Sequence, residues 1–221
     1  MGGLDFFEIV TTQRALRRFR PDPVPDDLLR RLIDAAARAP SARGAEPWAF
    51  VVVRDLATRQ AIGARYQQAW EAGERFTASA DADRDVKRLP HYGRMMRAAR
   101  HLALHFAEAP VLVVCCLDHQ RLGPIAAPDG GLVSPVTAYA SIFPAVQNLL
   151  LAARALGLGA TLTTLHRTFE EPLKTLLDVP AHVEIVSIVP VGYPRDRFGP
   201  TQRRPVGEVT FLDRWGKRFP A

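Results

Sequence analysis

The sequence contains little cysteine. Only two of its 221 residues, Cys115 and Cys116, are cysteines, and they are adjacent in an apolar run. The alternation of a β-strand would place their side chains on opposite faces of a sheet, which excludes a disulfide between them. We therefore predict two buried thiols in a central strand, with no redox or metal chemistry.

Lysine is also scarce, although the chain carries a formal net charge of +6. Only Lys87, Lys174 and Lys217 among the 29 basic residues are lysines. A basic surface can bind nucleic acid by releasing counterions from phosphates, but no helix-turn-helix, zinc-finger or RNP signature accompanies this charge. Two arginine clusters, at residues 14–20 and 195–204, are better explained by a single small anion. We predict no nucleic-acid partner.

Long uncharged apolar runs are missing. The longest candidate is interrupted by Arg154, so we predict no membrane-spanning helix. The N-terminus has Asp5 and Glu8 and lacks the basic region that opens a secretory signal peptide. These features predict a soluble cytoplasmic protein. At 221 residues and 48% hydrophobic, the chain is expected to form a single domain over residues 1–221.

Several catalytic and binding motifs are absent. The sequence has no Walker loop, nucleophile elbow or Cys-x-x-Cys site. Residues 157–162 begin like a dinucleotide fingerprint, but they lack its third glycine and follow a helix instead of a strand. His101 and His105 lie one helical turn apart, but Leu102 stands where a zincin has glutamate, so no metal is expected. We predict no catalytic side chain, which leaves redox chemistry carried by a cofactor.

Predicted helices and strands alternate along the chain without internal repeats. Hydrophobic periodicity and helix-end signals predict helices over residues 25–40, 56–70, 95–108, 136–156 and 170–177, and strands over residues 48–53, 111–117 and 183–191. This pattern predicts an α+β fold, an α/β sandwich in which helices flank a central mixed sheet.

Four of these segments carry further expectations. The apolar strand 48–53 is expected to be buried on both faces. The helix 136–156 is apolar nearly all round, which indicates a subunit interface. Residues 71–94 and 118–135 are predicted to be lids or loops over a pocket. The segment 195–221, rich in proline and arginine, is predicted to be an arm that wraps around another part of the protein.

Four blocks together resemble one known family. The first three are Thr11 to Phe19, Pro40-Ser41-Ala-Arg-Gly-Ala-Glu-Pro-Trp48, and the glycine-stopped helix that leads from Ser141 into Leu162-Thr163-Thr164. The last is Val189 to Pro194, followed by Arg203-Arg204-Pro205. In this order and spacing, they are similar to the FMN-dependent nitroreductases. The resemblance implies the nitroreductase fold, FMN as cofactor, NAD(P)H as reductant and a homodimer.

The resemblance also implies particular cofactor contacts. Arg14 and Arg17 match the N-terminal motif, in which Ala15 occupies a further cofactor-binding position, and Arg203 and Arg204 match the C-terminal phosphate-binding arm. Arg14, Arg203 and Arg204 would bind the FMN phosphate through charge-assisted hydrogen bonds. Arg17 would lie beside the pyrimidine edge of the ring and favour the reduced anion.

Two other segments would approach the flavin ring. The loop of Pro40, Ser41, Ala42, Arg43 and Gly44 would pack on it across the dimer interface. Leu162, Thr163 and Thr164 would present backbone N–H groups to the N5 edge. Four residues depart from the usual family pattern: Gln13, Ala15, Gly44 and Glu46 replace Arg, Ser, Asn and Gln.

The implied activity is a two-step reduction of a small electron-poor acceptor, such as a nitroaromatic or a quinone. Two alternatives stay open. A specialised branch of the family, of the reductive dehalogenase or flavin-destructase type, would use the same cofactor site with a different lid. A protein that sequesters FMN with little turnover would fit the missing Asn and Ser.

Overall fold

The fold is built on one four-stranded sheet with strand order β1-β2-β4-β3. The structure, a computed structural model, describes residues 4–79, 91–124 and 135–219. The strands are β1 (Trp48–Val53), β2 (Val111–Asp118), β3 (Gly159–Ala160) and β4 (Val183–Gly192), and each adjacent pair is antiparallel. The predicted mixed sheet is therefore wrong for the named strands. Within the described ranges, the one parallel pairing is an isolated bridge between Ala15 and Ala160.

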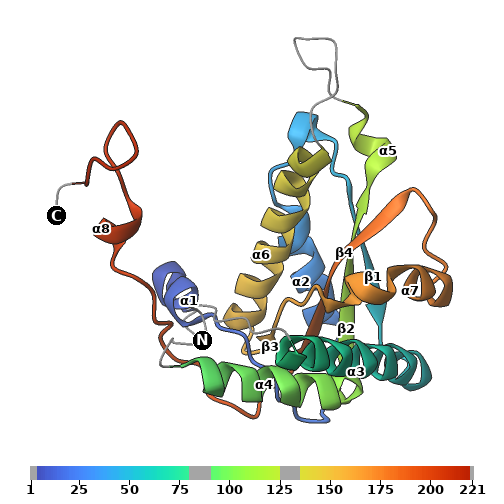
Figure 1. Ribbon diagram of the computed structural model, residues 1–221. Coiled ribbons are helices and arrows are strands. Elements are labelled where there is room, and N and C mark those ends of the chain that lie inside the picture. The colour runs from blue at the N-terminus through green and yellow to red at the C-terminus, as the bar shows by residue number, and fades with distance from the viewer. Residues whose placement is uncertain (1–3, 80–90, 125–134, 220–221) are drawn as a thin grey trace.

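Helices cover both faces of the sheet (Figure 1). Helices α2 (Asp26–Ala37) and α6 (Tyr139–Ala155) pack with one hydrophobic cluster, and α3 (Leu56–Ser79) and α4 (Tyr92–Leu104) pack with the other. The short elements are α1 (Phe6–Thr12), η1 (Ala42–Gly44), η3 (Phe106–Glu108), α5 (His119–Leu122), η4 (Pro135–Ala138), η5 (Leu165–Phe169), α7 (Glu170–Leu176) and α8 (Val206–Val209). The predicted α+β class is confirmed.

Strand β2 lies inside the sheet, and its side chains alternate between the two clusters. Cys115 contributes to the cluster under α2 and α6, whereas Cys116 contributes to the cluster under α3 and α4. Both cysteines are free, and burial raises the pKa of each thiol to about 12. The prediction of two buried thiols on opposite faces is confirmed, and with these pKa values neither is a thiolate near neutral pH.

Strand β1 was predicted at the observed position, but the prediction that it is buried on both faces is wrong. Only Val53 is buried, whereas Ala49 and Val52 are exposed. The reason is that β1 lies at the edge of the sheet and pairs only with β2. A continuous apolar run is typical of an interior strand, so this edge leaves apolar surface uncovered in a single chain.

The N-terminal end of α2 follows its sequence signals. Pro25 is the N-cap, and Asp26 and Asp27 occupy the positive end of the helix dipole. Leu29, Leu32 and the other core residue of this helix face the sheet. Because these signals are local, the predicted start is correct, and the helix ends at Ala37, shortly before the predicted limit at residue 40.

The predicted lid segments are partly helical. Helix α3 continues past Trp70 to Ser79, and α4 already begins at Tyr92, so both ends of the segment 71–94 are helical, and its role as a lid stays a prediction. Residues 119–122 form α5 within the second predicted loop. The remaining central parts of the two predicted lids, residues 80–90 and 125–134, lie outside the described residues.

Helix α6 is the core helix of the fold. Eight of its residues are buried, including Ile142 and Leu149, while Phe143 on its outer side is 39% exposed. The prediction of an apolar helix is confirmed. By length and composition, Val136–Ala155 could cross a membrane despite Arg154, contrary to expectation. Core helices of soluble proteins meet the same criterion, and here α6 packs against α2 and the sheet.

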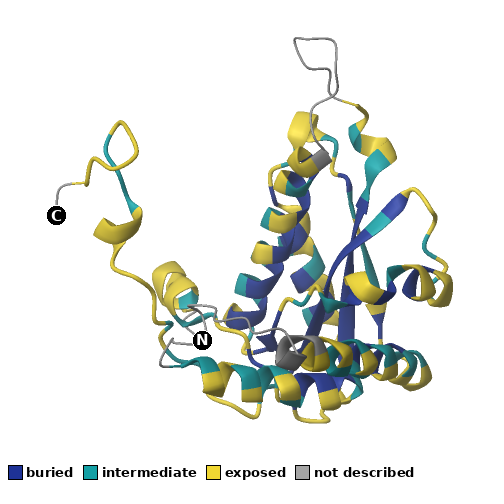
Figure 2. Cartoon of the chain, viewed as in Figure 1, coloured by how far each residue is buried: buried dark blue, intermediate teal, exposed yellow. Residues whose placement is uncertain are grey.

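The outer part of the C-terminal arm, which carries α8, extends away from the body of the chain (Figure 1). Its outer part, including α8, is exposed along most of its length (Figure 2). Each hydrogen bond recorded for residues 206–219 joins two residues of the arm, such as Leu212 N–H to the carbonyl of Lys217. The outer part of the arm therefore wraps around nothing within the described single chain, and its predicted wrapping role stays a prediction.

Candidate functional site

The N-terminal basic segment lies beside the short strand β3. Leu16 N–H donates to the carbonyl of Ala160 at 3.2 Å, and Arg20 N–H donates to the carbonyl of Tyr193 at 2.8 Å. Leu16 and Phe19 are buried, which anchors the segment in the core. The motif is thereby fixed at the end of the sheet where β3 and β4 meet.

Two arginines of this segment have no neutralising partner. Arg17 is half-buried, and burial lowers its pKa; Tyr66 opposes that effect, while the neighbouring charge of Arg14 adds to it. Neither arginine forms a hydrogen bond or ion pair with a residue that the structure describes. A half-buried cation without an acceptor is costly to a fold unless an anion completes it. The pair therefore forms a candidate anion site.

The backbone N–H of Thr164, the residue after Thr163, is free to bind a ligand. Its N–H and C=O groups both pair with Ile188, each at 3.0 Å. Because backbone N–H groups alternate in direction along an extended segment, the N–H of Thr164 points away from β4. This N–H donates to no acceptor among the described residues. Thr163 itself has no backbone donor left for a ligand, whereas Thr164 has one.

Tyr66 connects Arg17 of the N-terminal segment with Thr163. Its hydroxyl lies 2.7 Å from the hydroxyl of Thr163, and its ring stacks on Phe106 with centroids 4.1 Å apart. Burial raises the pKa of Tyr66, although Thr163 and Arg17 lower it in part, so the phenol is neutral near pH 7. Sequence reasoning missed this residue. The sequence feature that could have identified Tyr66 is a polar hydroxyl on the buried face of α3, one helical turn after Ile62.

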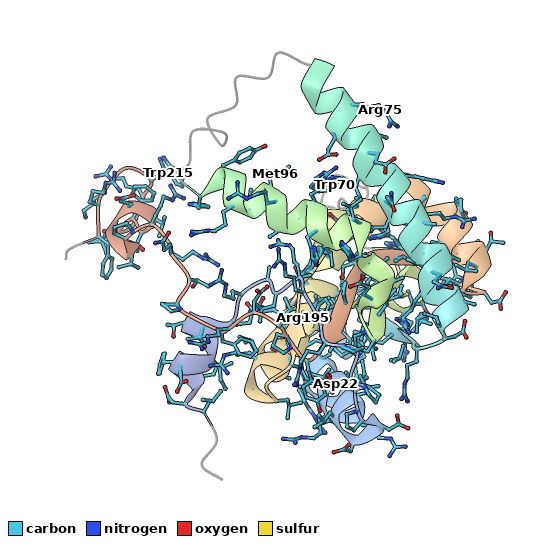
Figure 3. All side chains as sticks on the ribbon, turned by 90° about the horizontal axis from the view of Figure 1, so that it is seen from below. Asp22, Trp70, Arg75, Met96, Arg195 and Trp215 are labelled. Carbon is cyan, nitrogen blue, oxygen red and sulfur yellow. The ribbon has the colours of Figure 1, made fainter. Side chains whose placement is uncertain are left out.

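The arm begins against the N-terminal segment. Arg195 N–H donates to the carbonyl of Arg18 at 3.0 Å, and its guanidinium Nε donates to the carbonyl of Phe19 at 2.9 Å. Further along, Thr201 N–H donates to the carbonyl of Thr11 at 3.0 Å. Arg195, labelled in Figure 3, lies within the body of the molecule, away from Trp215 on the outer arm. Its role in the arm was not predicted from sequence.

Arg154 fastens the same junction from the C-terminal end of α6. Its Nε donates to the hydroxyl of Thr12 at 2.8 Å, and Nη2 lies 3.5 Å from a carboxylate oxygen of Glu8. The guanidinium also lies 4.3 Å from the centroid of the Phe198 ring. This buried arginine is therefore well partnered, unlike Arg17, and it joins α6 to α1 and to the arm.

Arg203 and Arg204 lie on the arm just beyond Thr201 and are exposed. Arg203 Nη1 donates to the neighbouring carbonyl of Gln202 at 2.8 Å, and neither arginine forms an ion pair with a described residue. Because Thr201 is bonded to Thr11, the structure brings the segments that carry the N-terminal and C-terminal arginines together. It records no direct contact between those arginines themselves.

The Pro40-to-Gly44 loop lies elsewhere in the same chain. Ala42 N–H donates to the hydroxyl of Ser141 at 3.1 Å, near the N-terminal end of α6, and Arg43 and Gly44 adopt positive φ angles of 58° and 64°. Thr12, which lies just before the basic segment, accepts a hydrogen bond from Arg154 at the other end of α6. Thirteen residues of helix separate these points by about 20 Å, so one chain does not bring the loop to the arginines.

A polar cluster closes the far end of β4. Glu184 Oε1 accepts hydrogen bonds from Tyr139 at 2.7 Å and from Arg167 at 2.6 Å, while His119 Nε2 lies 2.8 Å from Oε2. Burial raises the pKa of Glu184, but Tyr139, His119 and the charge of Arg167 outweigh it, so the net pKa is lowered. This carboxylate ties α5, α6 and η5 to the sheet.

The described part of the chain contains no group of three His, Cys, Asp or Glu residues that could hold a metal. His101 of α4 and His105, the C-cap residue of this helix, instead stack on each other. The rings of His101 and His105 have centroids 4.2 Å apart, and His105 Nδ1 lies 2.8 Å from Glu108. Burial and the neighbouring His105 lower the pKa of His101.

Two hollows lie next to the basic segment, and neither is lined by Arg14, Arg17 or Thr163. One of about 580 Å³ lies between the segment after Phe19 and α3, and one of about 690 Å³ lies between α4 and the arm. The predicted cofactor residues therefore lie outside both of these hollows.

Comparisons with known proteins agree with this architecture. The model of the nitroreductase family matches residues 10–193. An NADH dehydrogenase of Thermus thermophilus is 31% identical over 93% of this chain and 95% of its own length. A 5,6-dimethylbenzimidazole synthase of Rhodospirillum rubrum is 31% identical over 94% of this chain and 87% of its own length.

A solved structure shares the fold. Oxidised iodotyrosine deiodinase, in a crystal structure bound to FMN and 3-iodo-L-tyrosine, superimposes with a TM-score of 0.69 over 96% of this chain and 100% of that chain, at 22% identity. At this level of identity, the similarity establishes the fold alone. The family match over most of the chain, together with the two relatives, shows that this protein belongs to the nitroreductase family and is an oxidoreductase.

Proposed function

We propose that the protein is a homodimeric FMN-dependent oxidoreductase that takes hydride from NAD(P)H and reduces a small electron-poor acceptor, such as a nitroaromatic or a quinone. The observation that carries this proposal is that Tyr66 links the half-buried, unpartnered guanidinium of Arg17 to Thr163, the neighbour of the free Thr164 N–H. A cation and a backbone donor on one edge suit a planar ring that becomes negative at one side and accepts a hydrogen bond at another.

The residues present fit FMN in the following way. Arg14, Arg203 and Arg204 would hold the phosphate, because they are unneutralised cations on two segments that the Thr11–Thr201 hydrogen bond joins. Ala15 follows Arg14 beside Ala160 and would offer only backbone contacts. Arg17 would lie by the pyrimidine edge. FMN, when bound, supplies the hydride-transfer chemistry, so no catalytic side chain is required.

The chain's own groups would bind and orient. The N–H of Thr164, or that of Leu162 on the same side of the segment, would donate to the N5 edge. Thr163 would act indirectly, since its backbone is bonded to Ile188 and its hydroxyl to Tyr66. Tyr66 would thereby keep the segment fixed while Arg17 supplies charge. Such fixed donors and charges lower the cost of reorganisation during reaction.

A second copy of the chain would complete this site. The loop of Pro40, Ser41, Ala42, Arg43 and Gly44 is about 20 Å from the basic segment in its own chain, so its contacts to the ring would come from the partner. The apolar surface also needs a cover: Phe7 on α1, Val206 on α8 and Trp215 are 72%, 77% and 89% exposed. Exposed apolar surface of this extent marks an interface.

Two experiments test the proposal. The purified protein should be yellow, and heating should release noncovalent FMN, identified by chromatography. FAD, or a colourless protein that FMN cannot reconstitute, would refute it. Sedimentation should show one species near twice the 24.4 kDa chain mass, because large apolar interfaces typify permanent dimers. A stable flavin-bound monomer at micromolar concentration would contradict the dimer.

The branch within the family is a separate question. The similarity to a 5,6-dimethylbenzimidazole synthase and to iodotyrosine deiodinase favours, as a second candidate, a flavin-destructase or reductive-dehalogenase type of chemistry at the same site. The departures at Gln13, Ala15, Gly44 and Glu46 favour a third, an FMN-sequestering protein. Steady-state NAD(P)H consumption with a quinone distinguishes the proposed oxidoreductase, which turns over, from sequestration, which does not. We place the protein, as one domain over residues 1–221, in the cytoplasm.

A further inference from the structure

A basic hollow lies between the start of α4 and the arm. It has a volume of about 690 Å³ and is lined by His91, Gly93, Arg94, Arg97 and Gln202. Its lining contains three basic side chains and an amide, and no carboxylate from the described residues contributes to it. The hollow is separate from Arg14 and Arg17, which do not line it. Its volume suits part of a nucleotide better than a single inorganic ion.

The two arginines of the hollow are free to bind a ligand. Arg94 and Arg97 are both exposed and form no hydrogen bond or ion pair with any described residue. By contrast, Arg100 on the same helix lies 3.5 Å from a carboxylate oxygen of Glu74. Positions 94 and 97 are three residues apart, so their side chains share one face of α4. The hollow therefore concentrates positive charge that the described chain leaves uncompensated.

The guanidinium of Arg97 is directed back toward the beginning of the helix. Its Nη1 lies 3.6 Å from the position that a Cβ on Gly93 would take. Helix α4 has 13 residues, and its N-cap, His91, makes no side-chain capping hydrogen bond. The positive end of the helix dipole therefore adds to the charge of the arginines in the hollow. Guanidinium groups beside free first-turn N–H groups favour a phosphate monoester, which offers several acceptor oxygens.

The arm relates this hollow to the proposed cofactor site. Gln202 lies between two features of the arm. Before it, Thr201 is hydrogen-bonded to Thr11 of the N-terminal segment. After it come Arg203 and Arg204, the proposed FMN phosphate ligands. A ligand in the hollow would therefore lie next to the arm residues that we assign to the flavin phosphate. A dinucleotide is long enough to place nicotinamide on the ring and a second phosphate here.

We infer that Arg94 and Arg97 bind the 2′-phosphate of NADPH, so that NADPH is preferred to NADH as the reductant. This inference rests on the proposed function, because it assumes a nicotinamide coenzyme. It assigns the coenzyme's phosphate to the α4 hollow and the flavin's phosphate to Arg14, Arg203 and Arg204.

Direct binding tests the inference without any catalytic activity. Calorimetric titrations of the purified protein would compare adenosine 2′,5′-bisphosphate with adenosine 5′-monophosphate. Wild type should bind the bisphosphate at least about tenfold more tightly, the effect of one charge-assisted contact. Arg94→Gln combined with Arg97→Gln should remove that difference. Arg100→Gln, on the same helix but paired with Glu74, is the matched control and should keep it.

Kinetics and cofactor binding provide the remaining readouts. In the FMN-loaded enzyme, the double variant should lose about tenfold in kcat/KM for NADPH while kcat/KM for NADH is unchanged. Its melting temperature and FMN affinity should equal those of wild type, since neither arginine has a partner among the described residues. Equal affinity of wild type for the two adenosine nucleotides would overturn the inference. Loss of FMN affinity in the double variant would also overturn it, because the hollow would then belong to the flavin phosphate. If no flavin binds at all, the proposed function fails, but the adenosine titrations still decide whether the hollow recognises a 2′-phosphate.

Discussion

Replacement of Arg17 by methionine should have opposite effects on the stability of the apo-protein and on its affinity for FMN. Arg17 is half-buried beside Arg14, burial lowers its pKa, and it has no acceptor among the described residues. Methionine keeps an unbranched apolar stem while it removes the desolvated charge and its repulsion with Arg14. The apo-protein therefore gains stability in the variant.

Two opposing effects set the size of each change. Substitutions that remove functional strain commonly stabilise proteins by about 0.5–2 kcal/mol. In a chain of this size, each kcal/mol raises Tm by about 2–4 °C. Without the charge-assisted hydrogen bond from Arg17 to the flavin, FMN binding should weaken by about 1.5–3 kcal/mol. The midpoint potential of the bound flavin should also fall, by about 30 mV for each 1.4 kcal/mol by which the reduced anion is less stabilised.

Three measurements on the same two proteins decide the matter. Thermal denaturation of apo-protein gives the stability change, fluorescence titration gives FMN affinity, and dye-coupled reduction gives the potential. Arg14→Met is the matched control, because it removes a neighbouring cation assigned to the phosphate and should leave the potential nearly unchanged. If apo Arg17→Met melts below wild type, the free cation is not a source of strain. If its flavin potential equals that of wild type, Arg17 does not lie at the ring edge.

Three further predictions concern the arm, the core and the response to pH. Arg204→Ala should weaken FMN binding by about 1.5–3 kcal/mol in titrations of apo-protein and leave the flavin potential unchanged, since Arg204 is assigned to the phosphate; a shifted potential would contradict this. Gly192→Ala should destabilise the fold by about 1–3 kcal/mol, because a Cβ there would lie 2.6 Å from Cδ of Pro110, whose ring cannot turn aside. Urea denaturation measures this change, and an unfolding midpoint equal to that of wild type would show that the backbone shifts freely. Glu184 has a pKa below its ordinary value of 4.5, so its stabilising contribution is present above about pH 4.5 and is lost as the pH falls through the lower folded value. Glu184→Gln should therefore be less stable than wild type at pH 7, and the difference should shrink below pH 4.5; a constant difference would show that the carboxylate charge is not responsible.

Local signals in the sequence determined much of the secondary structure. The start of α2 follows from Pro25 and the acids after it, and the presence of a strand at β2 follows from its unbroken apolar run. The opposite burial of Cys115 and Cys116 follows from strand alternation alone. These features depend on a few neighbouring residues, so they could be predicted without knowledge of the fold. The four family motifs likewise identified the family, because each is contiguous in the sequence.

Only the tertiary structure decided which strands are interior and which polar groups have partners. An apolar run predicts a strand, but its neighbours decide exposure, so β1 proved to be an exposed edge. The partners of an arginine are likewise decided by the fold. Arg154 donates a hydrogen bond to Thr12 and lies over the Phe198 ring, whereas Arg17 has no acceptor in the described chain. Tyr66 joined the site because α3 carries its hydroxyl to Thr163, 97 residues away along the chain. Such pairings arise from long-range packing, which no local pattern encodes.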